Sequence, residues 1–287
     1  MVKVIPWPPL VLAGIRSGIA ALVIFFYDKP THLRFGKFTV GGAISYAIMV
    51  IFFVLANKMT TSGNAILIQY TAPVYVAIFS FSFLGEKSNT VDWITIFIML
   101  FGLGLFFFDE LSFTEFWGNI AALIAGFGFA ATILFMRKQK MGRPIDSVLL
   151  GNLITFFVCI PFITSDVTFE MKPWIGIFYL GIVQLGLSYV FFSKAIRYVS
   201  ALDAIIYPVI EPIFNPILAF FFLGEIMSGN AQIGGVLVII GVISRGLLQV
   251  ATTTKDINCG HLLEHLAQCP KCRLYLEKHF GKQENIQ

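Results

Sequence analysis

Glu211 lies deep in an apolar stretch that is interrupted by prolines at intervals of four residues, Pro208, Pro212 and Pro216. Each proline removes a backbone donor and frees a carbonyl oxygen one turn earlier. A charged side chain at such a depth in hydrocarbon costs about 2.5–3.5 kcal/mol, so it should face a cavity or a partner. The pattern therefore predicts a binding site on an interrupted helix, with Glu211 as its acid.

We expect Glu211 to bind a cationic or amine group of a small molecule, or a coupling proton, because desolvation favours the protonated carboxyl form. Arg16, about a third of the way into another apolar stretch, could instead form a buried ion pair with Glu211. Arg16 is also a candidate substrate ligand. The remaining candidates are polar side chains within apolar stretches, namely Tyr207, Asn215, Gln69, Tyr70, Tyr46, Gln184, Ser188, Tyr189 and Asn152. Any one of these could equally join two helices by hydrogen bonding.

The C-terminal tail carries a second cluster with ligand chemistry. Its members are Cys259, His261, His265, Cys269 and Cys272. His265 and Cys269 are four residues apart and share a helix face, and Cys269-x2-Cys272 is a metal-chelating spacing. The His-x3-Cys-x2-Cys pattern resembles the zinc motif of anti-sigma factors, so we expect zinc to stabilise this short segment. The alternative is an amphipathic helix that lies on the inner leaflet.

The composition places these candidate sites in a membrane protein. Charged residues make up 13% of the chain and hydrophobic residues 57%, whereas a soluble domain has about 25% charged residues. Spans of the length that the bilayer requires predict an all-α polytopic membrane protein with nine helices. They cover approximately residues 9–27, 38–56, 64–84, 91–108, 116–136, 146–163, 173–193, 202–223 and 231–250.

Lysine and arginine placement predicts the orientation of these spans. The loops that connect the spans form two alternating sets, and one set carries nearly all of their basic residues, such as Lys29, Lys87, Arg137, Lys138 and Arg143. Because the basic loops face the cytoplasm, we expect a multi-pass protein of the cell (inner or plasma) membrane with a cytoplasmic C-terminus. The net charge of +4 then reflects topology, and nucleic acid is not an expected partner.

The chain also contains an internal repeat at a shift of 139 residues. Phe81-x-Phe83-Leu84-Gly85-Glu86 recurs as Phe220-x-Phe222-Leu223-Gly224-Glu225, and Ala65-Ile66 as Ala204-Ile205. The copies lie five spans apart, which makes the repeat inverted in the membrane. We expect repeats at 1–110, with four helices, and 111–250, with five, followed by the tail at 251–287. The first helix of the first repeat is thus expected to be missing.

With the missing helix restored, the pattern of two inverted five-helix repeats, each closing on Leu-Gly-Glu, resembles the drug/metabolite transporter superfamily of EamA type. The matching stretches are Leu12-Ala13-Gly14-Ile15-Arg16, Ala72-Pro73 through Leu84-Gly85-Glu86, and Glu211-Pro212 through Leu223-Gly224-Glu225. The resemblance implies a secondary transporter, more typically an exporter, of small metabolites such as amino acids, amines or drug-like compounds. Its expected partners are that substrate, the bilayer and a coupling proton, with a homodimer as a candidate assembly.

Three further expectations follow from the motifs that the sequence contains and from those that it lacks. Neither a nucleophile–base arrangement nor a phosphate-binding loop is found, so we expect no enzyme activity and no cofactor for transport. The alternative function is a membrane sensor whose zinc-stabilised tail binds a cytoplasmic protein. Glu86 and Glu225 follow helix C-termini, where a carboxylate opposes the helix dipole, and we expect each to pair with a neighbouring base.

Overall fold

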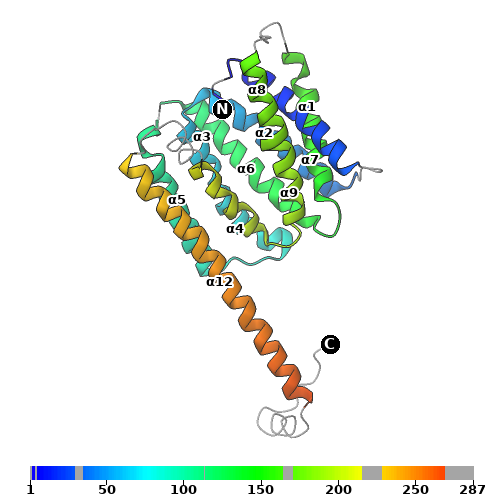
Figure 1. Ribbon diagram of the computed structural model, residues 1–287, viewed down its shortest axis with the longest axis vertical. Coiled ribbons are helices and arrows are strands. Elements are labelled where there is room, and N and C mark those ends of the chain that lie inside the picture. The colour runs from blue at the N-terminus through cyan, green and yellow to red at the C-terminus, as the bar shows by residue number, and fades with distance from the viewer. Residues whose placement is uncertain are drawn as a thin grey trace. The chain divides into compact units, whose positions relative to one another are not determined.

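The computed structural model describes residues 2–3, 5–29, 35–112, 114–163, 171–214 and 228–268, with side chains up to residue 248. The described residues form helices connected by short turns, without a strand (Figure 1). The chain divides into two compact units, Met1–Val242 and Ile243–Gln287. The second unit is helical up to Gln268, and the cavity, ends and grooves considered below all belong to the first.

Apolar helices make up the first unit, and together they confirm the all-α polytopic architecture. In the part of the chain that the structure describes, seven segments are long and apolar enough to cross a membrane, whereas α5 is shorter, at 17 residues. The predicted span at 202–223 is described only up to residue 214. The count of nine spans and the inversion of the repeat therefore stay predictions. The elements are α1 (Pro9–Asp28), α2 (Lys37–Met59), α3 (Ser62–Gln69), α4 (Ala72–Leu84), α5 (Thr90–Phe106), η1 (Phe108–Glu110), α6 (Phe116–Lys138), α7 (Pro144–Cys159), η2 (Ile160–Phe162), α8 (Met171–Tyr179), η3 (Leu180–Leu187), α9 (Ser188–Ala195), α10 (Ala201–Ile206), η4 (Tyr207–Ile210) and α12 (Gly229–Gln268).

Three of the predicted spans are not continuous α-helices. The span at 64–84 breaks between α3 and α4, just before Pro73. The stretch after α10 tightens into the 3-10 turn η4, which contains Pro208. Between α8 and α9 the backbone forms a π-helix, η3. Prolines explain the first two breaks, because a proline cannot donate the helical hydrogen bond.

Helix starts in the two halves share the same capping geometry. The Thr61 side chain accepts a hydrogen bond from the backbone N–H of Asn64 at the start of α3. The Ser200 side chain accepts one from the backbone N–H of Asp203 at the start of α10. Both pairs are related by the shift of 139 residues seen in the sequence. Side-chain caps of this kind satisfy donors that the first helical turn leaves free.

The central packing contact of the unit is between α2 and α6, which cross at Gly128. A Cβ added to Gly128 would lie 2.9 Å from the backbone nitrogen of Met49 and 3.1 Å from the carbonyl oxygen of Ser45. The two backbones therefore touch, an arrangement that small residues permit in membrane helices. Neither backbone atom can rotate away as the end of a side chain could.

We expect Gly128→Val to destabilise the bundle strongly. Overpacking usually costs about 1–3 kcal/mol, and here the added methyl groups would meet backbone. Gly104→Val is the matched control, because a Cβ at Gly104 in α5 meets no atom of the described residues within 4 Å. Thermal unfolding of the purified proteins in detergent should show a lower melting temperature for Gly128→Val alone. Equal melting temperatures for the two variants would contradict the contact.

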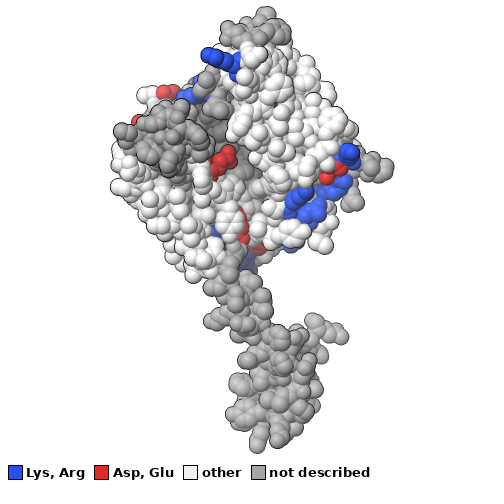
Figure 2. Space-filling view, viewed as in Figure 1, with Lys and Arg blue, Asp and Glu red and all other residues white. Residues whose placement is uncertain are grey.

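Basic residues from four connections meet at one end of the bundle, called the basic end from here on. There Lys194 donates to the hydroxyl of Tyr27 (2.7 Å), and Arg197 donates to the carbonyl of Gly142 (2.7 Å). Arg143 pairs with Asp28 and, at 3.1 Å, with Asp146. In Figure 2 much of the visible basic surface gathers along one side of the molecule. The loops predicted to share one side of the membrane are thus brought together.

One interaction at the basic end joins the two halves of the sequence. Arg137 Nε, at the end of α6, lies 2.8 Å from Glu86 Oε1. The same guanidinium donates to the carbonyls of Ile196 and Arg197, both at 2.9 Å, and Glu86 Oε2 accepts from the backbone N–H of Ala201 (2.8 Å). The predicted pairing of Glu86 with a base is confirmed. Glu225, its counterpart in the repeat, lies outside the described residues.

Candidate functional site

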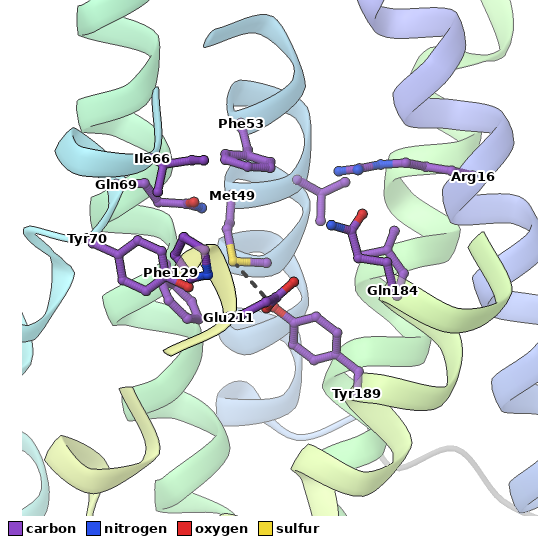
Figure 3. A pocket seen from close by; sticks show the side chains of 13 residues that line it. Arg16, Met49, Phe53, Ile66, Gln69, Tyr70, Phe129, Gln184, Tyr189 and Glu211 are labelled. Atoms are coloured by element: carbon purple, nitrogen blue, oxygen red, sulfur yellow. Dashed lines mark hydrogen bonds between the residues drawn. The ribbon is translucent and has the colours of Figure 1, made fainter. Parts of the chain in front are cut away.

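A cavity of about 170 Å³ lies within the bundle, where the interrupted segments meet α1, α2 and α6 (Figure 3). Arg16 in α1 and Phe53 in α2 lie nearer the end of their helices opposite the basic end, whereas Tyr189 at the start of α9 lies on the side of the basic end. The side chains that line it are Arg16, Met49, Val50, Phe53, Ile66, Gln69, Tyr70, Phe129, Gln184, Leu185, Tyr189, Glu211 and Pro212.

Two opposite charges face this cavity from different elements. Arg16 comes from α1 and is only 2% exposed, while Glu211 follows η4 and its side chain is exposed to the cavity. Figure 3 shows the two side chains pointing into the cavity from different sides. Within the described part of the chain neither one has an ion-pair partner, and Arg16 Nε has no hydrogen-bond partner. The buried Arg16–Glu211 ion pair considered from the sequence is therefore not formed.

The π-helix η3 brings Gln184 to the same cavity. In a π-helix the hydrogen bonds reach back five residues, and such segments often lie at functional sites. The backbone N–H of Ser188 shows this register, because it donates to the carbonyl of Val183, five residues earlier. Ser188 Oγ donates to the same carbonyl (2.9 Å). Gln184 Oε1 is buried without a hydrogen-bond partner among the described residues, so the cavity wall offers an unused acceptor beside the free donor of Arg16.

A close helix crossing fixes the relative position of η3 and Arg16. A Cβ added to Gly181 would lie 2.7 Å from Cβ of Ile19 and 2.9 Å from the carbonyl oxygen of Arg16. Only glycine allows η3 to approach the α1 backbone this closely. We expect Gly181→Ala to push α1 outward and displace the guanidinium, reducing transport without preventing folding. Transport by Gly181→Ala proteoliposomes, compared with Gly104→Ala as control, measures this; equal rates would contradict it.

Aromatic residues separate the cavity from the basic end. The rings of Tyr46 and Tyr189 meet edge to face at 4.9 Å, and the Tyr189 hydroxyl donates to Met49 Sδ at 3.6 Å. The Tyr70 hydroxyl donates to the carbonyl of Pro208 (3.1 Å), which ties the α3–α4 break to η4. The two interrupted segments thus support one another at the cavity floor.

Six of the substrate-binding residues predicted from the sequence line the cavity: Arg16, Gln69, Tyr70, Gln184, Tyr189 and Glu211. Tyr46, Asn152, Ser188 and Tyr207 do not. Asn152 is buried, and its amide donates to the Tyr46 hydroxyl (3.1 Å) and to the Val148 carbonyl. The bond to Tyr46 joins α7 to α2, whereas Asn152 Oδ1 has no hydrogen-bond partner among the described residues. Neither residue lines the cavity, and a role for them in substrate binding stays a prediction. Tyr207 packs against the apolar core of the bundle.

The remaining predicted residues cannot be placed. Asn215, Cys269 and Cys272 lie outside the described residues, and the side chains of Cys259, His261 and His265 are not described either. The zinc site, and with it the sensor alternative that depends on the tail, stays a prediction. Sequence reasoning also missed the apolar half of the cavity wall, such as Phe53 and Phe129. In spans that are apolar on every side, no periodic signal marks which face looks inward.

A comparison with known protein families agrees with three features described above. These are the acid on an interrupted helix, the matching helix caps and the internal repeat. The profile of the EamA-like transporter family matches residues 2–108 and again residues 116–244. The chain belongs to the EamA-like transporter family. It is therefore a transporter rather than an enzyme, and a multi-pass membrane protein.

Curated relatives of this EamA-like protein include two named exporters. The threonine/homoserine exporter RhtA of Salmonella typhimurium (strain LT2) is 25% identical over 235 residues, which cover 76% of this chain and 75% of RhtA. The pseudopaline exporter CntI of Pseudomonas aeruginosa (strain UCBPP-PA14) is 23% identical over 245 residues, covering 83% and 86%. A solved structure with a TM-score of 0.72, 18% identity and coverage of 85% of this chain and 90% of its own shares the fold.

Proposed function

We propose that this EamA-like protein exports small zwitterionic metabolites of amino-acid size by alternating access to the cavity between Arg16 and Glu211. One observation carries the proposal: a buried cation and an acid face one cavity without pairing to each other or, in the described residues, to any other charge. Charges within a membrane protein need compensation. A substrate with a carboxylate for Arg16 and an ammonium group for Glu211 supplies both.

Cavity size and the polar rim support a small substrate. Pockets for drug-sized ligands usually measure about 300–1,000 Å³, whereas this cavity measures about 170 Å³. Gln69 and Gln184 add amide groups that can hydrogen-bond to a polar substrate. The names of the relatives agree with this chemistry, because threonine and homoserine are zwitterions. Because both named relatives are exporters, we also propose that this chain exports its substrate.

The test is a substrate panel in reconstituted vesicles. We expect threonine to be transported. The amine that lacks the threonine carboxylate, and N-acetylthreonine, which lacks the ammonium group, should each be transported at least about tenfold more slowly. Each of these analogues leaves one cavity charge unpaired. Arg16→Gln should narrow the difference between threonine and the amine. Lys140→Gln, which removes a charge from an exposed loop, should leave the preference unchanged. Equal transport of the amine and threonine by the native protein would contradict the zwitterion proposal.

A further inference from the structure

A second hollow lies between α4 and α6, on the outside of the bundle. Its volume is about 330 Å³, and hydrocarbon lines nearly all of it. Phe79 and Phe127 are half exposed there, so this hollow opens to the surroundings of the protein. We call it the α4–α6 groove. Its lining residues are Tyr75, Phe79, Ser82, Phe83, Phe127, Ala130, Ala131, Leu134 and Phe135.

The groove runs along the helices towards the basic end. The rings of Tyr75 and Phe127 stack at 3.9 Å at one end of it, and those of Phe83 and Phe135 meet edge to face at 5.2 Å at the other. Tyr75 and Phe83 are eight residues apart on one helix, which spans about 12 Å at 1.5 Å per residue. Ala130 and Ala131 leave the space that larger side chains would fill. The shape suits an extended hydrocarbon chain.

Two lysines stand where the groove reaches the basic end. Lys138 Nζ donates to the carbonyl of Phe83 (2.6 Å) and lies 5.4 Å from the Phe83 ring and 5.9 Å from the Phe38 ring. Lys37 Nζ lies 5.1 Å from the same Phe38 ring. Both lysines are exposed, and in the described residues neither one pairs with a carboxylate. An ammonium group has three donors, so Lys138 keeps two for another acceptor.

We propose that the α4–α6 groove and these two lysines form a binding site for an anionic phospholipid. One acyl chain lies in the groove against Phe79, Phe83 and Phe127, and the phosphate accepts hydrogen bonds from Lys37 and Lys138. Charge complementarity selects the headgroup, because a lipid such as phosphatidylcholine carries its own cation towards the lysines. Basic residues beside a membrane attract anionic lipids in this way.

The experiment compares two lipids that differ only in headgroup. Phosphatidylglycerol or phosphatidylcholine with identical acyl chains is titrated into the full-length protein in detergent, and the bound lipid is counted by native mass spectrometry. We expect tighter binding of phosphatidylglycerol to the native protein. Lys138→Gln should weaken that binding about fivefold, the effect of one lysine beside an anionic lipid. Ala131→Leu, which fills the groove, should weaken the binding of both lipids.

Lys194→Gln is the matched control. Lys194 also lies over an aromatic ring at the basic end, 4.8 Å from the centre of Tyr27, but it does not belong to the groove. Its loss should leave the preference for phosphatidylglycerol unchanged. Equal binding of the two lipids to the native protein would overturn the proposal, as would equal losses for Lys138→Gln and Lys194→Gln. If Ala131→Leu fails to fold, the comparison of the two lysine variants still decides.

Discussion

Glu211→Gln is expected to lower transport of a zwitterionic substrate by roughly tenfold to a hundredfold. A hydrogen bond to a charged group contributes about 1.5–3 kcal/mol, and each 1.4 kcal/mol corresponds to about tenfold in binding. Glutamine keeps the size of the side chain but carries no charge for the ammonium group. Among the residues that line the cavity, Arg16 would then be the only charged side chain left.

The measurement is efflux of labelled substrate from vesicles at several external pH values. If a coupling proton also binds at Glu211, the residual transport by Glu211→Gln should lose its dependence on pH. Glu110→Gln removes an exposed carboxylate outside the cavity and should behave like the native protein. A Glu211→Gln protein with unchanged rate and unchanged pH dependence would remove Glu211 from the mechanism and with it the proposed function.

Arg137→Gln is expected to open the basic end of the bundle. The Arg137 side chain is 12% exposed and that of Glu86 25%, so their pairing is partly shielded from water. The guanidinium also holds the carbonyls of Ile196 and Arg197, and Glu86 holds the N–H of Ala201. Glutamine cannot replace all of these bonds. The state closed at this end should lose stability, and transport should fall because the closed state is required for alternation.

Accessibility of a cavity residue measures this effect. In a protein whose four cysteines are replaced by serine, Gln69→Cys can be labelled with a membrane-impermeant thiol reagent from either side. We expect Arg137→Gln to raise labelling from the side of the basic end by about tenfold, the loss of one charged hydrogen bond. Lys140→Gln removes the same charge from a neighbouring exposed position and should change nothing. Identical labelling of the two variants would show that the pairing does not hold this end closed.

Several features of the site could be predicted from the sequence because hydrocarbon makes polar groups conspicuous. Arg16, Gln69, Gln184 and Glu211 stand out in apolar spans, and all four line the cavity. Phe53 and Phe129 line it as well, but they look like dozens of other apolar residues in the sequence. The same reasoning included Asn152, whose amide N–H groups donate to Tyr46 and Val148 and which does not line the cavity. Helix joining and ligand binding employ the same residue types, and only contacts distinguish them.

The sequence by itself determined that this is a helical membrane protein with a duplicated plan, because composition, span length and the 139-residue shift depend only on residue order. Only the tertiary structure decided which charged side chains form ion pairs. It shows Arg16 and Glu211 at one cavity without an ion pair, and it pairs Glu86 with Arg137 across the basic end. It also shows the π-helix η3, which contains no proline and which we did not predict from the sequence. These outcomes depend on distances between helices that are remote in sequence. Close backbone crossings set these distances, such as that of Gly128 in α6 against α2 and that of Gly181 in η3 against α1.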